Sequence, residues 1–111
     1  YQRYEGGYFM NKEAFKKSLA DQGYVLVDFY ASWCGPCKTM DNVLDEVISQ
    51  FDDLSLIKID VDKERRLAMA YGVMSLPAII LFHHGNALYQ FIGLTSREEI
   101  VKKIEELKNR Q

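Results

Sequence analysis

The sequence has 111 residues, a formal net charge of −2 and 48% hydrophobic residues. We expect one domain spanning residues 1–111, because a chain of this length can bury a core without a metal or a disulfide framework. The balanced charge argues against nucleic-acid binding, and two cysteines are too few for a disulfide-stapled scaffold. The longest apolar runs, 25–27 and 78–82, are too short for this segment to insert in a membrane.

The amino-terminal residues are the hardest to interpret. Residues 1–10 are expected to be weakly ordered or to form a short edge strand. Since the first residue is Tyr1 and not Met, we expect the chain to have been processed, trimmed or excised from something longer. The lack of a visible leader therefore says nothing about the compartment.

Three elements are predicted in the first half of the chain. Asn11 can cap a helix that ends near Gly23. Residues 24–30 are almost continuously apolar, which is typical of a strand covered on both faces. From Cys34 to Phe51 the apolar residues recur at helical spacing and predict an amphipathic helix.

The second half continues with strands and shorter helices. Residues 54–59 predict a strand, and Asp62 can cap a short helix after it. Residues 78–82 and 87–92 predict a hairpin whose turn is Gly85-Asn86. Ser96, with Glu99 three residues later, forms a capping box that opens a final helix.

The order of these elements predicts an α/β fold. Strand–helix–strand crossovers imply parallel pairing in the core of the sheet, and the hairpin adds an antiparallel edge. We therefore expect a central mixed sheet of four to five strands, flanked by helices on both faces.

The chemistry is concentrated in Trp33-Cys34-Gly35-Pro36-Cys37, where a strand leads into a helix. The helix dipole and the unpaired N–H groups of the first turn stabilise a Cys34 thiolate, and in such sites they lower the cysteine pKa from about 8.5 to about 7. Pro36 is tolerated in the first turn, and Gly35 leaves the approach to Cys34 open. Cys34 is expected to attack a substrate disulfide, and Cys37 to resolve the mixed disulfide.

A zinc site is the other interpretation of this cysteine pair. It has little support, because the chain has no second cysteine pair and the side chains of His83 and His84, adjacent on a strand end, are expected to diverge. We expect no metal and no cofactor apart from the redox-active disulfide Cys34–Cys37.

Three further residues are candidates for catalysis. Asp28 interrupts an apolar strand; a carboxyl group buried there would have a raised pKa and could exchange a proton with Cys37. Its alternative role is that of a strand residue at a solvated edge. Lys58 is a plausible neighbour of Asp28 or a snorkelling surface lysine. Pro77 alone could be an ordinary trans residue at the start of a strand.

Several segments resemble thioredoxin. The stretch 27–38 is similar to the active-site segment of that family, 71–77 resembles its proline loop, and Gly93 falls at its late glycine. The similarity runs from about Glu13 to Leu107, so it implies a thioredoxin fold for nearly the whole chain.

The resemblance assigns further roles. Pro77 would be the cis-proline that faces the dithiol, and Asp28 and Lys58 would be the buried acid and its partner. Backbone groups of Ser75 and Leu76 would pair with an extended substrate. The substrate-binding residues would be Trp33, Gly35, Pro36, Met74, Ser75, Leu76, Gly93 and Leu94. Met74 and Leu94 could instead belong to the core.

The Gly-Pro dipeptide resembles the reducing members of the family. We therefore expect a protein-disulfide reductase in cell redox homeostasis, with a potential near about −270 mV. Its partners would be protein disulfides and a recycling reductase, namely thioredoxin reductase. A monomer in the cytoplasm is expected, with a periplasmic or other extracytoplasmic location left open. Tyr30 and Asn42 replace the usual tryptophan and proline of the family.

Two alternatives remain open at this point. One is an extracytoplasmic or membrane-tethered thioredoxin-like domain that serves particular clients. The other is a binding module of the same fold in which redox activity is incidental.

Overall fold

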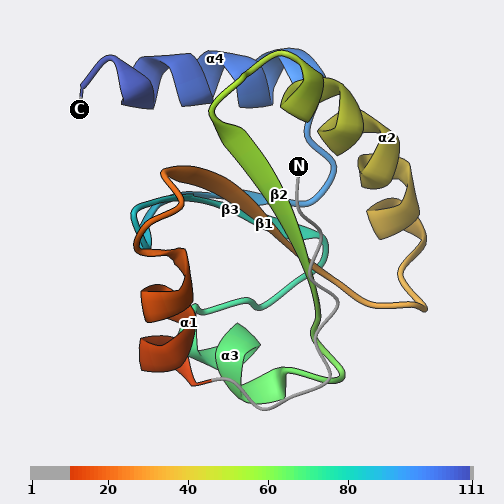
Figure 1. The fold of residues 1–111 in the computed structure, drawn as a ribbon. Coiled ribbons are helices and arrows are strands. Elements are labelled where there is room, and N and C mark those ends of the chain that lie inside the picture. The colour runs from red at the N-terminus through yellow and green to blue at the C-terminus, as the bar shows by residue number, and fades with distance from the viewer. Residues whose placement is uncertain (1–10, 111) are drawn as a thin grey trace.

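The computed structural model describes residues 11–110, and the predicted order of helices and strands is confirmed (Figure 1). The elements are α1 (Lys12–Leu19), β1 (Tyr24–Tyr30), α2 (Gly35–Ser49), β2 (Leu54–Asp60), α3 (Arg65–Ala70), β3 (Ala78–His83), β4 (Asn86–Ile92) and α4 (Arg97–Lys108). The described part of the sheet has four strands. The edge strand considered for residues 1–10 lies outside the described residues.

The sheet is mixed, with the strand order β2-β1-β3-β4. The crossover through α2 joins the parallel pair β1 and β2, as predicted. The crossover through α3 gives no parallel pair, because β3 runs antiparallel to both β1 and β4. Ala78 pairs with Phe29, so β3 starts at the end of the sheet where β1 finishes. The segment between β2 and β3, which includes the six-residue helix α3, leaves and rejoins the sheet at this same end.

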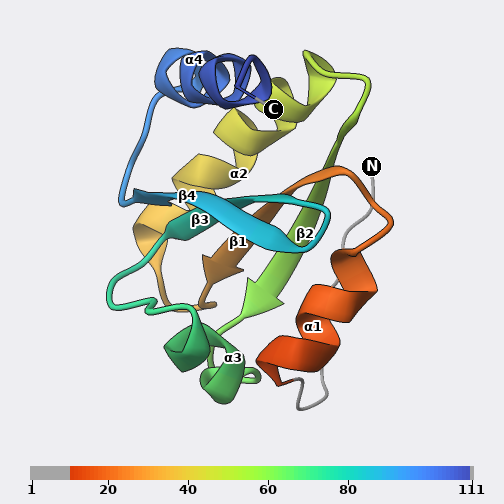
Figure 2. The same cartoon turned by 90° about the vertical axis from the view of Figure 1, so that its left-hand side faces the viewer.

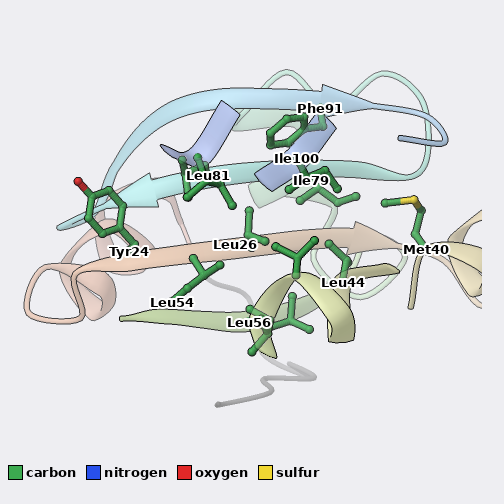
Figure 3. Packing of buried hydrophobic residues seen from close by; sticks show 13 residues of the cluster. Tyr24, Leu26, Met40, Leu44, Leu54, Leu56, Ile79, Leu81, Phe91 and Ile100 are labelled. Atoms are coloured by element: carbon green, nitrogen blue, oxygen red, sulfur yellow. The ribbon is translucent and has the colours of Figure 1, made fainter. Parts of the chain in front are cut away.

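Helices cover both faces of the sheet, with α2 and α4 on one side and α1 and α3 on the other (Figure 2). Because successive strand residues point to opposite faces, Leu26 and Leu56 pack toward α2 and α4 (Figure 3). Val27 and Phe29 pack on the opposite side, against α1 and α3. The same alternation places Asp28 and Lys58 on the α2 side of the sheet.

The predicted caps are right at two helices and wrong at one. The Asn11 side chain accepts a hydrogen bond from the Ala14 N–H at 2.7 Å, and Ser96 Oγ accepts one from the Glu99 N–H at 3.1 Å. Asp62 does not cap α3, which begins at Arg65 without a capping side chain. The Asp62 carboxylate is bonded elsewhere, at the site described below.

The hairpin turn lies one residue earlier than predicted. Its two central residues are His84 and Gly85, with φ of 50° and 86°, and Asn86 already pairs with His83. Positive φ at both positions suits the right-handed twist of a tight hairpin. The histidine rings do not diverge: because His84 has turned into this loop, their centroids lie 4.3 Å apart.

Candidate active site

The two cysteines lie where β1 leads into α2. Cys34 is the N-cap residue of α2, with an extended backbone, and its Sγ accepts a hydrogen bond from the Cys37 N–H at 3.2 Å. Pro36 lies in the first turn, where its missing N–H costs no helical bond. The predicted position of Cys34 at the start of the helix is confirmed. A thiolate there would face unpaired N–H groups and the positive end of the helix dipole.

Cys34 and Cys37 form a disulfide with a Cα–Cα distance of 5.4 Å. Both are buried, and together with Ala31 they form a small cluster against which Leu76 and Val61 pack. A Cβ atom added at Gly35 would meet nothing within 4 Å, so the surface beside the disulfide is open at this residue. The pair is therefore held by the fold and can be approached from one side.

The proline loop borders this cluster. The Leu76–Pro77 peptide bond is cis, as the resemblance implies. The Pro77 carbonyl oxygen accepts a hydrogen bond from the Gly93 N–H at 2.8 Å. This bond joins the loop to the end of β4, and Leu76 brings the loop against the disulfide.

A cavity of about 210 Å³ lies beside the loop. Its lining residues are Trp33, Val61, Ala68, Val73, Met74, Ser75 and Leu76. Trp33 and Met74 are 70% and 93% exposed, and Ile92 and Leu94 are both 63% exposed. Met74 and Leu94 are therefore surface residues and not core.

We call Trp33, Met74, Ile92 and Leu94 the apolar rim. Ile92 was not among the predicted site residues. Alternation along β4 would have indicated it, because Phe91, its neighbour, is buried.

Trp33 is fixed by a residue that the sequence did not mark as part of the site. Its Nε1 donates a hydrogen bond to Asp62 Oδ2 at 2.9 Å. The Asp62 N–H donates in turn to Asp60 Oδ1 at 2.9 Å. The loop after β2 thus holds the indole of Trp33, the residue next to Cys34, and no local sequence pattern indicates this arrangement.

A charged layer lies on the α2 side of the sheet, at the end of the strands that carries the cysteines. Asp28 is completely buried, and its Cα pairs with that of Lys58 on the neighbouring parallel strand. Lys58 is only 6% exposed, so it is not a snorkelling surface lysine. Because Asp28 is buried as well, the alternative that it faces a solvated edge is wrong.

Lys58 has a partner that was not predicted. Its Nζ lies 2.8 Å from Asp41 Oδ1 on α2 and 4.5 Å from the centroid of the Tyr30 ring. Helical spacing could have indicated Asp41, because it follows Cys37 by four residues and shares its side of α2. Asp28, Lys58 and Asp41 are called the charged layer below.

Residues 11–110 hold no group of three or more histidine, cysteine, aspartate or glutamate side chains arranged to bind a metal ion. In the same part of the chain, no helix combines the length and the apolar character needed to cross a bilayer.

Comparisons with known proteins agree with this geometry. The thioredoxin family model matches residues 8–106. The chain is 37% identical over 95 residues to a thioredoxin of Chlamydia trachomatis, covering 86% of this chain and 92% of that protein. It is 41% identical over 86 residues to a thioredoxin of Bacillus subtilis, covering 74% and 83% of the two chains.

A solved structure has the same fold. A single-site mutant of a thioredoxin from Halobacterium salinarum superposes with a TM-score of 0.79 at 32% identity, over 95% of this chain and 89% of that one. The similarity is therefore not limited to the cysteine motif. The structural match includes the sheet and the helices, and the family model matches nearly the whole chain. The chain therefore belongs to the thioredoxin family and is a thiol–disulfide oxidoreductase whose redox centre is the Cys34–Cys37 pair.

Proposed function

We propose that this oxidoreductase works as a reductant of protein disulfides, with Cys34 as the nucleophile and Cys37 as the resolving thiol. The asymmetry of the pair carries the proposal. Cys34 Sγ lies at the N-cap and accepts the Cys37 N–H, whereas Cys37 lies within the first turn of α2. These contacts favour negative charge on Cys34.

The reaction has two balanced steps. The Cys34 thiolate attacks one sulfur of the substrate disulfide, forms a mixed disulfide and releases the other sulfur as a thiolate that takes up a proton. Cys37 then loses its proton and attacks Cys34, which breaks the mixed disulfide and releases the second substrate thiol. Two electrons pass to the substrate, and the Cys34–Cys37 disulfide remains.

Asp28 is proposed to accept the proton of Cys37 in the second step. Its burial on the α2 side of β1, near the end of the strand that leads to the cysteines, supports this role. Lys58, paired with Asp28 across the parallel strands, is proposed to adjust the charge of that carboxyl group.

The cavity beside the proline loop is proposed as the substrate groove. Pro77 would face the bound disulfide, while backbone groups of Ser75 and Leu76 pair with an extended peptide. The open surface at Gly35 and Pro36 would admit the substrate sulfur. The apolar rim, with Gly93 between two of its members, would contact apolar side chains of the partner.

The partners proposed are proteins with accessible disulfides, and thioredoxin reductase as the enzyme that restores the dithiol. Residues 1–111 would act as one domain and as a monomer in the cytoplasm. The bacterial thioredoxins among the relatives support the choice of partners. Cell fractionation of the full-length gene product would test the proposed compartment.

A redox titration of the Cys34–Cys37 pair tests the direction of electron flow. The protein is equilibrated with glutathione or dithiothreitol buffers, and the fraction of disulfide is measured by thiol alkylation. A potential of about −270 mV supports a reductant, whereas one above about −200 mV would place the chain with isomerases and oxidants.

A further inference from the structure

The salt bridge between Lys58 and Asp41 is not explained by the reaction steps above. It joins β2 to α2 with an Nζ–Oδ1 distance of 2.8 Å, and the Lys58 side chain is 8% exposed while that of Asp41 is 36% exposed. A largely buried ammonium is costly unless a carboxylate or another acceptor is near it. Asp41 supplies such a carboxylate to Lys58, although Asp41 is not among the predicted catalytic residues.

The position of this ammonium matters because Lys58 is in register with Asp28. Paired residues on neighbouring strands project to the same face of the sheet, here toward α2. Lys58 therefore shares a face of the sheet with Asp28 of β1, while its ammonium is bonded to the Asp41 carboxylate of α2. An opposite charge within about 4–6 Å stabilises the ionised form of a carboxyl group, so moving the ammonium changes the strength of Asp28 as a base.

Other titratable groups among residues 11–110 also lie on this side of the sheet. From β1 and β2, the polar side chains on this face besides Asp28 and Lys58 are Tyr24, Tyr30 and Asp60. Asp60 accepts the Asp62 N–H, and Tyr24 stacks on His83 at the far end of the strands. Tyr30 places its ring 4.5 Å from Lys58 Nζ. The residue opposite Asp28 on β3 is Ile79, and α4 adds only Ile100 and Ile104 to the buried cluster on this side.

The helix α2 carries the two cysteines, Asp41 and three exposed charged residues, Lys38, Asp45 and Glu46. Cys34 and Cys37 are joined as the disulfide, and Asp41 follows Cys37 by one turn. Asp45 lies one turn further on the same side and is exposed, so solvent screens its charge.

We propose that Asp41 is a positioning residue that holds the Lys58 ammonium toward α2 and thereby keeps Asp28 a strong enough base to take the proton of Cys37. This inference rests on the proposed role of Asp28. In this role Asp41 acts through Lys58, with which it forms the salt bridge. In the absence of the Asp41 charge, the ammonium is free to move toward Asp28 and to favour its ionised form.

The test measures the second step of the reaction alone. A mixed disulfide between Cys34 and a chromogenic thiol is formed in a stopped-flow instrument, and the release of that thiol is followed from pH 4 to pH 9. Asp41→Asn is expected to move the acidic limb of this rate profile to lower pH by roughly one unit, the low end of the effect of a nearby opposite charge. The rate on the plateau should fall with it, because the base is weaker.

Three matched variants separate positioning from other effects. Asp41→Glu keeps the charge and should restore the wild-type limb. Asp45→Asn removes an equal charge one turn away and should leave the limb in place. In a Lys58→Met background, or Lys58→Gln if the first does not fold, Asp41→Asn should have no further effect.

The outcomes distinguish this inference from the proposed function. If Asp28→Asn leaves the acidic limb unchanged, the proposed role of Asp28 fails. If Asp28→Asn abolishes the limb but Asp41→Asn does not move it, only the positioning role is refuted. An equal shift with Asp45→Asn, or a shift that persists without Lys58, would also overturn it, because the charge would then act directly and not through the ammonium.

Discussion

The two sides of the dithiol are built from opposite kinds of residue. Toward solvent lies the apolar rim, whose members are between 63% and 93% exposed. Toward the sheet lies the charged layer, in which Asp28 and Lys58 are buried. Apolar side chains are exposed to solvent on one side of the cysteines, and charged side chains are buried on the other.

Neither arrangement is what folding alone favours. Exposed apolar side chains add no stability and mark contact surfaces, while buried charges cost free energy unless they are paired. We therefore expect the apolar rim to determine the binding of partners and the charged layer to determine proton transfer. Changes on the two sides should therefore alter different kinetic constants.

The largest effects are expected at the cysteines, where the two sides meet. Cys34→Ser should abolish reduction, because no nucleophile remains at the N-cap. Cys37→Ser should instead accumulate a covalent mixed disulfide, since Cys34 can attack but nothing resolves it. Non-reducing gels and mass spectrometry of the protein incubated with a disulfide-linked peptide would check both. Absence of a covalent complex with Cys37→Ser would show that the two roles are assigned the wrong way round.

A change in the charged layer should come next. Asp28→Asn is expected to slow kcat near neutral pH by roughly 100-fold, the low end of what a positioned general base contributes. KM should change little, because Asp28 is buried beneath the site and cannot touch the substrate. Steady-state kinetics across pH would measure both constants, and a wild-type rate profile would make Asp28 a bystander.

A change in the rim should show the reverse pattern. Met74→Ala is expected to raise KM for a protein disulfide about fivefold, which corresponds to about 1 kcal/mol, and to leave kcat close to wild type. Met69 offers a matched control, since it is 77% exposed on α3 but does not line the cavity. Equal effects of Met69→Ala and Met74→Ala would mean that the rim is not a specific docking surface.

The features that sequence analysis predicted are local ones. The burial of 24–30 and the cap at Ser96 each depend on residues close together in the chain, and both are confirmed. The Cys34 position at the start of α2 followed in the same way. The resemblance to thioredoxin added the cis bond before Pro77, for which a single sequence has no local signal.

Two of the contacts that were missed join distant segments. Trp33 and Asp62 are 29 residues apart, and Lys58 and Asp41 are 17 apart. Such pairs depend on which helix packs over which strand, and composition or periodicity cannot specify that. The antiparallel direction of β3 was missed for a related reason, because it depends on the end of the sheet at which the segment between β2 and β3 rejoins it and not on any pattern within β3.

The smallest effect is expected at Tyr71, a half-buried residue whose hydroxyl is enclosed on the side of the sheet opposite the charged layer. Its hydroxyl has no hydrogen-bond partner among the described residues, and its ring packs edge-on against Phe15 and Phe82. Tyr71→Phe should therefore change the free energy of unfolding at pH 7 by less than about 1 kcal/mol. The same variant should leave kcat and KM unchanged. That result would show that an enclosed polar group does not by itself affect the reaction, in contrast to Asp28.

The same variant makes a prediction about alkaline stability. Burial, with a smaller contribution from the Glu13 charge, raises the pKa of Tyr71 above its ordinary value of 10.0. Above that pH the unfolded chain releases the phenolic proton before the folded protein does, so the stability contributed by Tyr71 is complete below pH 10 and declines as the pH rises further. The loss of stability between pH 9 and pH 11, followed by urea unfolding, should be smaller in Tyr71→Phe than in the wild type. Parallel curves for the two proteins would mean that the phenol ionises equally readily in the folded and unfolded chains.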